Sequence, residues 1–257
     1  ARLQQAGWGI KYITHVENKN TVKLQDRPWF KTTFTKLHVF GLTEYDKIVY
    51  LDADILLLAN VDELFEKLPL NADANSTDLL ERRPFAAASE VFPPDTFNSG
   101  VLVIRPRQAI FEWLLQESLH VPSYDGSDQG FLNTVFGDWW QLPIGHRLAF
   151  KYNVPQTLAM YFPPEWDKMV ADNSISVLHF AGDDSMKPWS FSGVIPASLA
   201  RYLHLWQEIA RAPLAADVAP LYRAVLSPPQ TAAQPNDRQA HMSEEEEEIE
   251  QVANLYA

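Results

Sequence analysis

The sequence predicts an α/β protein in which buried strands alternate with helices. Apolar runs at Lys47–Leu58, Phe85–Ala88 and Phe97–Ile104 are typical of buried strands, and helical patterns separate them. Polar residues stand at the strand edges, which is where α/β sheets bind ligands. The 257 residues, 46% of them hydrophobic, suffice for one sizeable core, or for one domain plus a tail.

The first predicted elements are a short strand at Gly9–Ile13 and a helix from Pro28 to Gly41. Proline is favoured in the first turn of a helix, and it presets the backbone there. The apolar stripe of this helix, expected in the core, consists of Phe30, Phe34 and Leu37. Lys36 lies off the stripe, so spacing alone favours a solvated side chain.

The run Lys47–Leu58 carries two carboxylates at its centre, Asp52 and Asp54, separated by Ala53. Alternation along a strand would point both carboxylates to the same side. Buried charges need partners or a metal, so we expect the strand to end here beside a divalent cation. Oxygen ligands suit Mn²⁺ or Mg²⁺, with a phosphate sharing the ion. The alternative is a strand-end pair that caps a following turn.

Loops and helices fill the middle of the chain. A short helix is expected from Asn60, followed by a polar surface insertion at Pro69–Pro84. The insertion contains Asn75-Ser76-Thr77, an N-glycosylation acceptor if the chain is secreted. A helix is expected from Gln108 to Leu119.

The later elements begin with a turn at Asp125–Gly130 that becomes a helix, for which Asp128 is a suitable cap. Leu148–Pro164 is predicted to be irregular, Ser176–Phe180 to be a short strand, and Ala197–Arg211 to be the final helix. Four residues lie at edges of predicted strands and are expected to share one crevice: Asp52, Asp54, Asn98 and His179.

Composition excludes several classes of protein. The chain has no Cys, so neither a disulfide framework nor a thiolate metal site is available. No apolar run approaches the ~20 residues of a membrane-spanning helix, and no basic cluster indicates nucleic-acid binding. Six Glu between residues 244 and 250 supply half of the net charge of -12. We expect a domain over 1–226 and a disordered acidic tail over 227–257.

Five motifs, in order, resemble glycosyltransferase family 8 and especially its glycogenin-like members. They are Thr33–His38, Val49–Asp54, Phe97–Val101, Asp125–Gly130 and His179–Gly182, the last followed by Lys187-Pro188-Trp189. The resemblance implies a single GT-A domain, a Rossmann-like fold that binds nucleotide sugars. It also implies transfer of a hexose from a UDP-sugar with retention at the anomeric carbon, glucose being the first candidate. The implied cofactor is Mn²⁺, or Mg²⁺ in its place.

The family motifs also imply site residues. The metal ligands would be Asp52, Asp54 and His179, a set of two carboxylates and an imidazole that suits Mn²⁺. The nucleotide-sugar contacts would be Lys36, Asp52, Ala53, Asn98, Ser99, Gly182 and Lys187. The candidate catalytic residues are Asp125, Asp128 and Gln129. Either Asp125 or Asp128 acts as a nucleophile, or the leaving phosphate helps to deprotonate the acceptor on the front face, which we favour.

The chain departs from the family pattern in two places. Family members begin with a strand that carries nucleotide-base contacts, and this sequence starts after it, so we expect an incomplete base pocket and an absent first strand. Met160 stands at the place of the tyrosine that glycogenins glucosylate, with Tyr161 one residue later, which argues against self-glucosylation. The acceptor stays open between a carbohydrate and a protein- or lipid-linked group. A homodimer is a candidate assembly, and a cytoplasmic location is slightly favoured over the Golgi or endoplasmic reticulum lumen.

Two other functions compete with this one. A haloacid-dehalogenase-like phosphatase also places Asp-x-Asp after a strand, but that class has Thr or Val where Leu56 stands. It also leaves the motifs at Asn98, Asp128-Gln129 and Lys187–Trp189 unexplained. The second is a nucleotide-sugar-binding scaffold without turnover.

Overall fold

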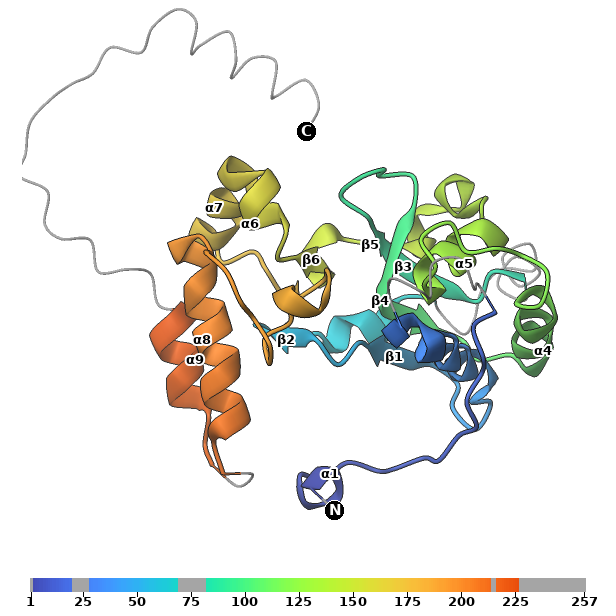
Figure 1. Ribbon diagram of the computed structural model, residues 1–257, viewed down its shortest axis with the longest axis horizontal. Coiled ribbons are helices and arrows are strands. Elements are labelled where there is room, and N and C mark those ends of the chain that lie inside the picture. Colours follow the sequence, from blue (N-terminus) through green and yellow to red (C-terminus); the bar gives the residue numbers. More distant parts are fainter. Residues whose placement is uncertain (1, 20–27, 69–81, 214–215, 227–257) are drawn as a thin grey trace, which may run out of the picture. The chain divides into compact units, whose positions relative to one another are not determined.

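The computed structural model describes residues 2–19, 28–68, 82–213 and 216–226 (Figure 1). These residues belong to one compact unit, Ala1–Leu226. Most of the predicted insertion, with its Asn75-Ser76-Thr77 motif, and the predicted tail over 227–257 lie outside the described residues.

The described strands form two sheets. The larger sheet has the order β1-β4-β3-β5 and the smaller one has the order β2-β7-β6. In chain order the strands are β1 (Ile48–Leu51), β2 (Ile55–Leu57), β3 (Phe85–Ser89), β4 (Phe97–Ile104), β5 (Arg147–Leu148), β6 (Val154–Pro155) and β7 (Val177–His179). Strand β4 is antiparallel to both β1 and β3, whereas β5 runs parallel to β3. The two sheets are therefore mixed.

The predicted strand over Lys47–Leu58 is two strands in two different sheets. Leu51 is still paired with β4, opposite Val101, whereas Ile55 pairs with β7, opposite His179. Asp52, Ala53 and Asp54 form the crossing between the sheets. One continuous apolar run cannot reveal this break, because both halves of the run are compatible with a strand.

The helices pack against the sheets and share the core with them. The α-helices are α1 (Arg2–Gln5), α4 (Gln108–Glu117), α5 (Asp128–Val135), α6 (Leu158–Tyr161), α7 (Pro163–Ala171), α8 (Ala197–Arg211) and α9 (Ala219–Leu226). The 3-10 helices are η1 (Pro28–Gly41), η2 (Asp62–Glu66), η3 (Trp139–Gln141), η4 (Ile144–His146), η5 (Phe150–Tyr152) and η6 (Asp184–Met186). None of the described helices is both long and apolar enough to cross a membrane.

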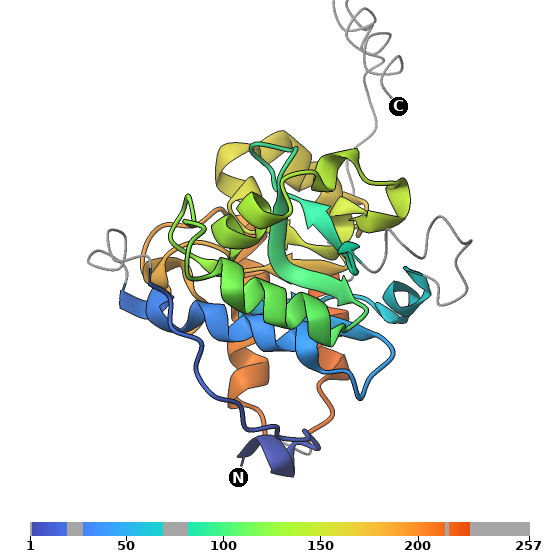
Figure 2. The same ribbon diagram turned by 90° about the vertical axis from the view of Figure 1, so that its right-hand side faces the viewer.

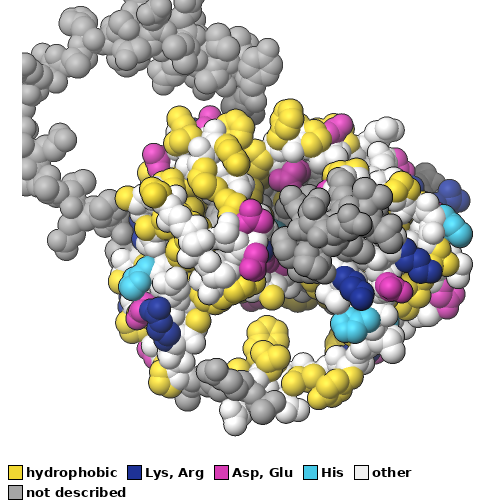
Figure 3. All heavy atoms as spheres, viewed as in Figure 1, with side chains coloured by type: hydrophobic (Ala, Val, Ile, Leu, Met, Phe, Trp, Pro, Cys, Tyr) yellow, Lys and Arg dark blue, Asp and Glu magenta, His cyan; other side chains and the backbone are white. Residues whose placement is uncertain are grey.

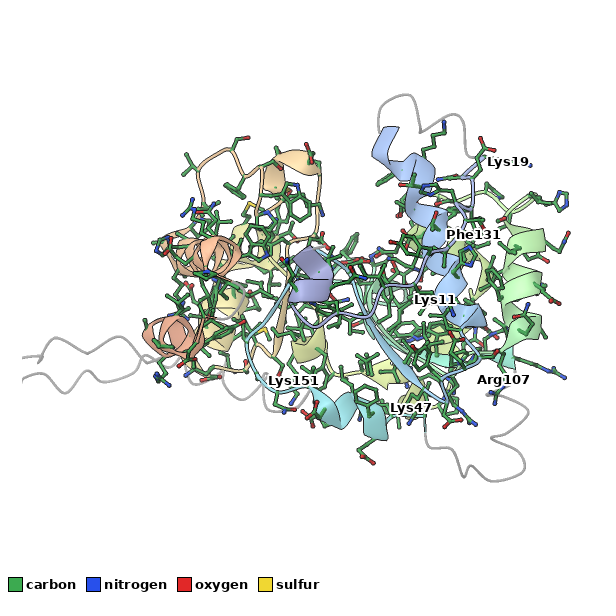
Figure 4. All side chains as sticks on the ribbon, turned by 90° about the horizontal axis from the view of Figure 1, so that it is seen from below. Lys11, Lys19, Lys47, Arg107, Phe131 and Lys151 are labelled. Carbon is green, nitrogen blue, oxygen red and sulfur yellow. The ribbon has the colours of Figure 1, made fainter. Side chains whose placement is uncertain are left out.

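Helix η1 positions one side of the site, and it packs beside α4 against the larger sheet (Figure 2). The predicted stripe is largely correct, because Phe34 and Leu37 are fully buried while Phe30 is half-buried. Phe34 stacks on Phe131 of α5, with ring centroids 4.9 Å apart, so η1 and α5 share one core (Figure 4). At the opposite edge, Lys47 donates a hydrogen bond to the Phe65 carbonyl of η2.

Three sequence-based expectations about elements were wrong. Gly9–Ile13 is not a strand, and Tyr12 is 90% exposed, since so short an alternation buries too little apolar surface to hold a strand in place. Leu148–Pro164 is not irregular but contains β6, η5 and α6, which are too short to produce a periodic signal. Ala197–Arg211 is a helix but not the last one, because α9 follows and packs beside it.

Candidate functional site

Asp52, Asp54 and His179 meet at the crossing between the two sheets. One potential ligand atom from each residue lies within 4.8 Å of those from the other two. The backbone explains this proximity: Asp52 N donates to Gly100 O at 2.8 Å, and Phe180 N donates to Asp54 O at 2.8 Å. The end of β1, the start of β2 and the end of β7 therefore present three side chains to one point.

The negative charge of Asp54 is offset by two neighbouring side chains, Lys187 and His179. Lys187 Nζ lies 2.5 Å from Asp54 Oδ2, and His179 Nε2 lies 3.4 Å from Oδ1. Burial by itself raises the pKa of Asp54, but His179 and Lys187 outweigh it and hold that pKa well below its ordinary value. Asp54 is consequently ionised at neutral pH.

Asp52 is balanced differently, by Lys36 of η1 and by Tyr50 of β1. Lys36 Nζ lies 3.1 Å from the Asp52 carboxylate and 2.6 Å from Asp128 Oδ2. Burial alone lowers the pKa of Lys36, but the carboxylates of Asp128 and Asp52 together raise it above its ordinary value. The Tyr50 hydroxyl donates to Asp52 Oδ1 at 2.6 Å. The Lys36 side chain is only 8% exposed, so the solvated position that its spacing favoured is wrong.

Asp128 faces Lys36 rather than capping its helix. The cap of α5 is Ser127, whose hydroxyl accepts a hydrogen bond from Gln129 N. Asp128 Oδ2 accepts from Ser99 Oγ at 2.8 Å. Burial raises the pKa of Asp128, Lys36 opposes this shift, and the nearby charge of Asp52 adds to it. Two carboxylates thus share one buried ammonium group.

A chain of amides fixes the orientation of the His179 ring. Gly100 N donates to Asn98 Oδ1 at 2.9 Å, so this atom must be an acceptor. Asn153 Nδ2 donates to the same oxygen at 2.8 Å, which turns Asn153 Oδ1 toward His179 Nδ1, 2.9 Å away. His179 therefore donates its Nδ1 proton to Asn153, and Nε2 is the ring nitrogen that faces Asp54 and is placed to bind a cation. Gly100 has to be glycine here, because a Cβ would lie 2.6 Å from His179 Nδ1.

Glu90 joins Asn98, a predicted nucleotide-sugar contact, to Gln129, a predicted catalytic residue, and was itself not predicted. Its Oε2 accepts hydrogen bonds from Asn98 Nδ2 at 2.9 Å and from Gln129 Nε2 at 3.0 Å. Gln129 Oε1 in turn accepts from Ser99 N at 3.1 Å. The sequence did contain a signal, which is position: Glu90 directly follows strand β3, as Asp52 directly follows β1.

Asp125 is turned into its own loop. Its Oδ1 accepts from Ser123 Oγ, Ser127 N and Gly130 N, at 2.7, 2.7 and 3.1 Å. Its Oδ2 accepts from Ser127 Oγ at 2.8 Å. These contacts make Asp125 the organiser of the loop that presents Asp128. A catalytic role for Asp125 stays a prediction.

Lys187 and Gly182 lie on a loop that a buried glutamine holds at both ends. Gln156 Nε2 donates to Ala181 O at 3.1 Å and to Met186 O at 2.7 Å. Gly182 has a φ of +121°, which side chains rarely adopt, and a Cβ there would lie 2.6 Å from Met186 Sδ. The sequence did not reveal Gln156 or Asn153, because both lie in the stretch predicted to be irregular. Ala53 is exposed between the two carboxylates.

A cavity of about 420 Å³ adjoins this cluster on the side of η1. Its lining combines hydroxyl groups with the charged residues described above: Ile13, Thr32, Thr33, Thr35, Lys36, Tyr50, Asp52 and Asp128. Polar hydrogen-bonding groups next to a carboxylate pair suit a polar ligand better than an apolar one.

Comparison with known proteins agrees with this geometry. The model of the family "Glycosyl transferase family 8" matches residues 5–193. "Glycogenin-1" of Caenorhabditis elegans is 38% identical over 200 residues, which are 77% of this chain and 42% of that protein. "Putative UDP-glucuronate:xylan alpha-glucuronosyltransferase 4" of Arabidopsis thaliana is 31% identical over 187 residues, which are 73% of this chain and 28% of that protein.

A solved structure supports the predicted fold class. It is the apo form of the glycosyltransferase GlyE of Streptococcus pneumoniae TIGR4, with a TM-score of 0.52 and 24% identity, over 76% of this chain and 45% of that one. This likeness confirms a GT-A-like α/β fold. The chain spans less than half the length of the relatives it matches. The match to the family model covers well over half of the sequence, and this chain belongs to glycosyl transferase family 8.

Proposed function

We propose that this chain is a Mn²⁺-dependent retaining hexosyltransferase that uses a UDP-sugar, with glucose as the first candidate sugar. The observation that carries the proposal is the cluster of Asp52, Asp54 and His179, whose ligand atoms lie within 4.8 Å of one another. The family and the name of the Arabidopsis thaliana relative, which includes a UDP-sugar, support a nucleotide-sugar donor. The phosphatase alternative loses its basis, because the motifs that it left unexplained belong to this family.

The residues of the cluster fit a divalent cation. Two carboxylates and the Nε2 lone pair of His179 form a donor set that Mn²⁺ accepts, with Mg²⁺ as an alternative that prefers oxygen ligands. The bound cation would act as a Lewis acid that neutralises charge on the departing nucleoside diphosphate. Asn153 and Asn98 would keep His179 oriented for this task, as outer-shell partners of metal ligands do.

Two lysines would serve the donor in different ways. Lys187 contacts Asp54 and the Phe180 carbonyl in the free protein. With a nucleotide present, its ammonium group would turn to the diphosphate, and the backbone near Gly182 would approach the same oxygens. Lys36, fixed between Asp52 and Asp128, would instead hold the sugar end of the donor in place.

The transfer itself exchanges one bond at the anomeric carbon for another. The acceptor oxygen bonds to that carbon, the bond to the diphosphate oxygen breaks, and its electron pair leaves on UDP. The acceptor proton passes to the leaving phosphate on the front face. We favour this route because Asp128 is engaged by Lys36 and Ser99 while Asp125 is engaged by its own loop. Both carboxylates are therefore held by neighbouring groups in the free protein.

A neutral sugar fits better than a uronic acid. The carboxylate of glucuronate would need a cationic partner, and Lys36 at the sugar end is already shared by two carboxylates. This balance favours UDP-glucose over UDP-glucuronate. A homodimer stays a prediction.

The test is calorimetric titration with UDP, with and without Mn²⁺, on the wild type, on Asp54→Ala and on Asp46→Ala. Asp46 is an exposed aspartate outside the site and serves as the matched control. We expect binding that requires Mn²⁺ and is lost only in Asp54→Ala. Release of UDP from UDP-glucose but not from UDP-glucuronate would then support the donor. Saturable binding of a UDP-sugar without any release of UDP would support the scaffold alternative. A UDP affinity that is unchanged by Mn²⁺ and by Asp54→Ala would refute the metal site.

A further inference from the structure

A second cavity is lined by Glu90 and by none of the candidate cation ligands. Its volume is about 440 Å³, and it lies between the loop that joins β3 to β4 and the segment around α6. It is lined by Glu90, Val91, Phe92, Thr157, Leu158, Tyr161 and Phe162. Figure 1 shows the loop facing α6, and Figure 3 shows hydrophobic side chains gathered over these two parts of the molecule.

Glu90 connects this cavity to the candidate site. Its Oε2 atom accepts hydrogen bonds from Asn98, a predicted nucleotide-sugar contact, and from Gln129, a predicted catalytic residue. Its Oε1 atom accepts a hydrogen bond from Val91 N at 3.0 Å. A single carboxylate, fixed at both oxygens, therefore forms part of the wall of the second cavity and of the network behind the donor contacts.

The aromatic side chains of the cavity are unusually open to solvent. Phe92 is 82% exposed and Tyr161 is 73% exposed, and Phe162 adds a third exposed ring. Apolar rings on opposite sides of one cavity gain free energy when a ligand covers them. The C–H face of a pyranose carries partial positive charge and is complementary to the electron-rich face of an aromatic ring. The hydroxyl groups of the same sugar can bond to Glu90 and Thr157.

The charge of the lining residues further restricts the class of ligand that this cavity can bind. None of the described residues that line the cavity is basic, and Glu90 is acidic. An anionic sugar would therefore meet a carboxylate without a compensating cation. A lipid chain would desolvate the Glu90 carboxylate without replacing its hydrogen bonds to water, which is costly. A neutral carbohydrate avoids both penalties.

We propose that this cavity is the acceptor subsite and binds a neutral pyranose unit of an oligosaccharide. Phe92 and Tyr161 contact the faces of the ring, and Glu90 accepts hydrogen bonds from its hydroxyl groups. The designation of this sugar as the acceptor rests on the proposed transferase function, whereas the binding of the carbohydrate does not. The alternative to an oligosaccharide acceptor is the hydroxyl group of Tyr161, which would then itself receive the sugar.

The test measures binding of maltohexaose and of xylohexaose to the full chain by calorimetry, without any nucleotide. The variants are Phe92→Ala and, as the matched control, Phe65→Ala, which removes a ring that is 50% exposed on η2, outside this cavity. We expect saturable binding of at least one oligosaccharide. Phe92→Ala should weaken it about threefold to tenfold, as the loss of one aromatic contact does, and Phe65→Ala should leave it unchanged.

Equal affinities of the wild type and Phe92→Ala would overturn the proposal, as would no saturable binding of either oligosaccharide. A hexose found on Tyr161 by mass spectrometry after incubation with UDP-glucose would also overturn it, and would assign the cavity to the chain's own tyrosine. Failure of the wild type to bind UDP with Mn²⁺, together with oligosaccharide binding that depends on Phe92, would refute the transferase function and leave the carbohydrate site standing.

Discussion

Asp52 and Asp54 are separated by one residue, and each faces a lysine from a distant part of the chain, but the two ion pairs are built differently. Lys36 lies on a helix packed against the larger sheet, contacts Asp52, Asp128 and Ser99, and is 8% exposed. Lys187 lies on a loop, contacts Asp54 and one carbonyl group, and is 19% exposed.

This difference indicates that Lys36 is a permanent counter-ion, whereas Lys187 can be exchanged for another cation. Moving Lys36 away would leave two carboxylates without a cation, and one of them, Asp128, is buried, which makes the cost several kcal/mol. Moving Lys187 away costs less, because His179 still faces Asp54 and the loop exposes the ammonium group to water. The Asp52 side is thus built as a fixed framework, and the Asp54 side as a place where a metal and a diphosphate can replace a lysine.

The largest expected effect comes from removing the permanent counter-ion. Lys36→Met should lower the free energy of unfolding by about 3–5 kcal/mol, because it leaves the buried Asp128 and the half-buried Asp52 without a cation. Lys187→Met should lower it by only about 1 kcal/mol, the net contribution of one hydrogen bond, because His179 remains beside Asp54. Urea unfolding at neutral pH measures both losses. Equal losses would contradict the distinction between a permanent and an exchangeable counter-ion.

The next effect tests the fixed orientation of His179. Asn153→Ala removes the acceptor for His179 Nδ1 and should weaken Mn²⁺ binding about 10- to 100-fold, the usual cost of losing an outer-shell partner. Asn18→Ala is the control, since Asn18 is an equally buried asparagine that bonds to the carbonyl groups of Phe30 and Gly126 instead. Calorimetric titration with Mn²⁺ measures both variants, and a similar loss in both would indicate a general effect of unfolding.

The sequence was most informative where a side-chain pattern repeats over several residues. The apolar runs of β3 and β4 and the helical spacing of η1, α4 and α8 predicted those elements nearly to their ends. The cluster of Asp52, Asp54 and His179 was also predictable, because all three stand at strand edges and the motif order is specific. In these places local pattern and tertiary structure agree.

The sequence was least informative where long-range packing decides. Two-residue strands such as β6 exist because a neighbouring strand pairs with them, and no periodicity records that. The spacing of Lys36 predicts its angle around η1, but it does not predict that Asp52 and Asp128 form ion pairs with it. Asn153 and Gln156 act through hydrogen bonds to residues more than twenty positions away, so no local signal identifies them.

A smaller effect concerns the exchangeable counter-ion. If Lys187 competes with the cation for Asp54, Lys187→Met should strengthen binding of Mn²⁺ alone by about fivefold, since the net contribution of one such hydrogen-bonded contact is about 1 kcal/mol. The same variant should weaken binding of UDP in the presence of Mn²⁺, because the diphosphate loses its ammonium partner. Lys151→Met, which removes an exposed lysine paired with Glu63, is the control for net charge. Changes of the same sign for Mn²⁺ and UDP would contradict the exchange.

The smallest expected effect is on the pH dependence of the free energy of unfolding, to which Asp54 and Asp128 should contribute with opposite signs. The folded pKa of Asp54 is held below its ordinary value of 3.8, so its contribution to stability is present above that pH and is lost as the pH falls through the folded pKa. The folded pKa of Asp128 is raised above 3.8, so the folded state takes up this proton first, and acidification favours folding at this group.

The two carboxylates should therefore change the acid branch of the stability curve in opposite directions. Asp54→Asn should make the loss of unfolding free energy on acidification shallower than in the wild type, and Asp128→Asn should make it steeper. Urea unfolding at a series of pH values on either side of 3.8 compares the slopes. Slopes that shift in the same direction would mean that the two ion pairs are electrostatically alike, and that the exposure and flexibility of Lys187 alone distinguish the two sides of the site.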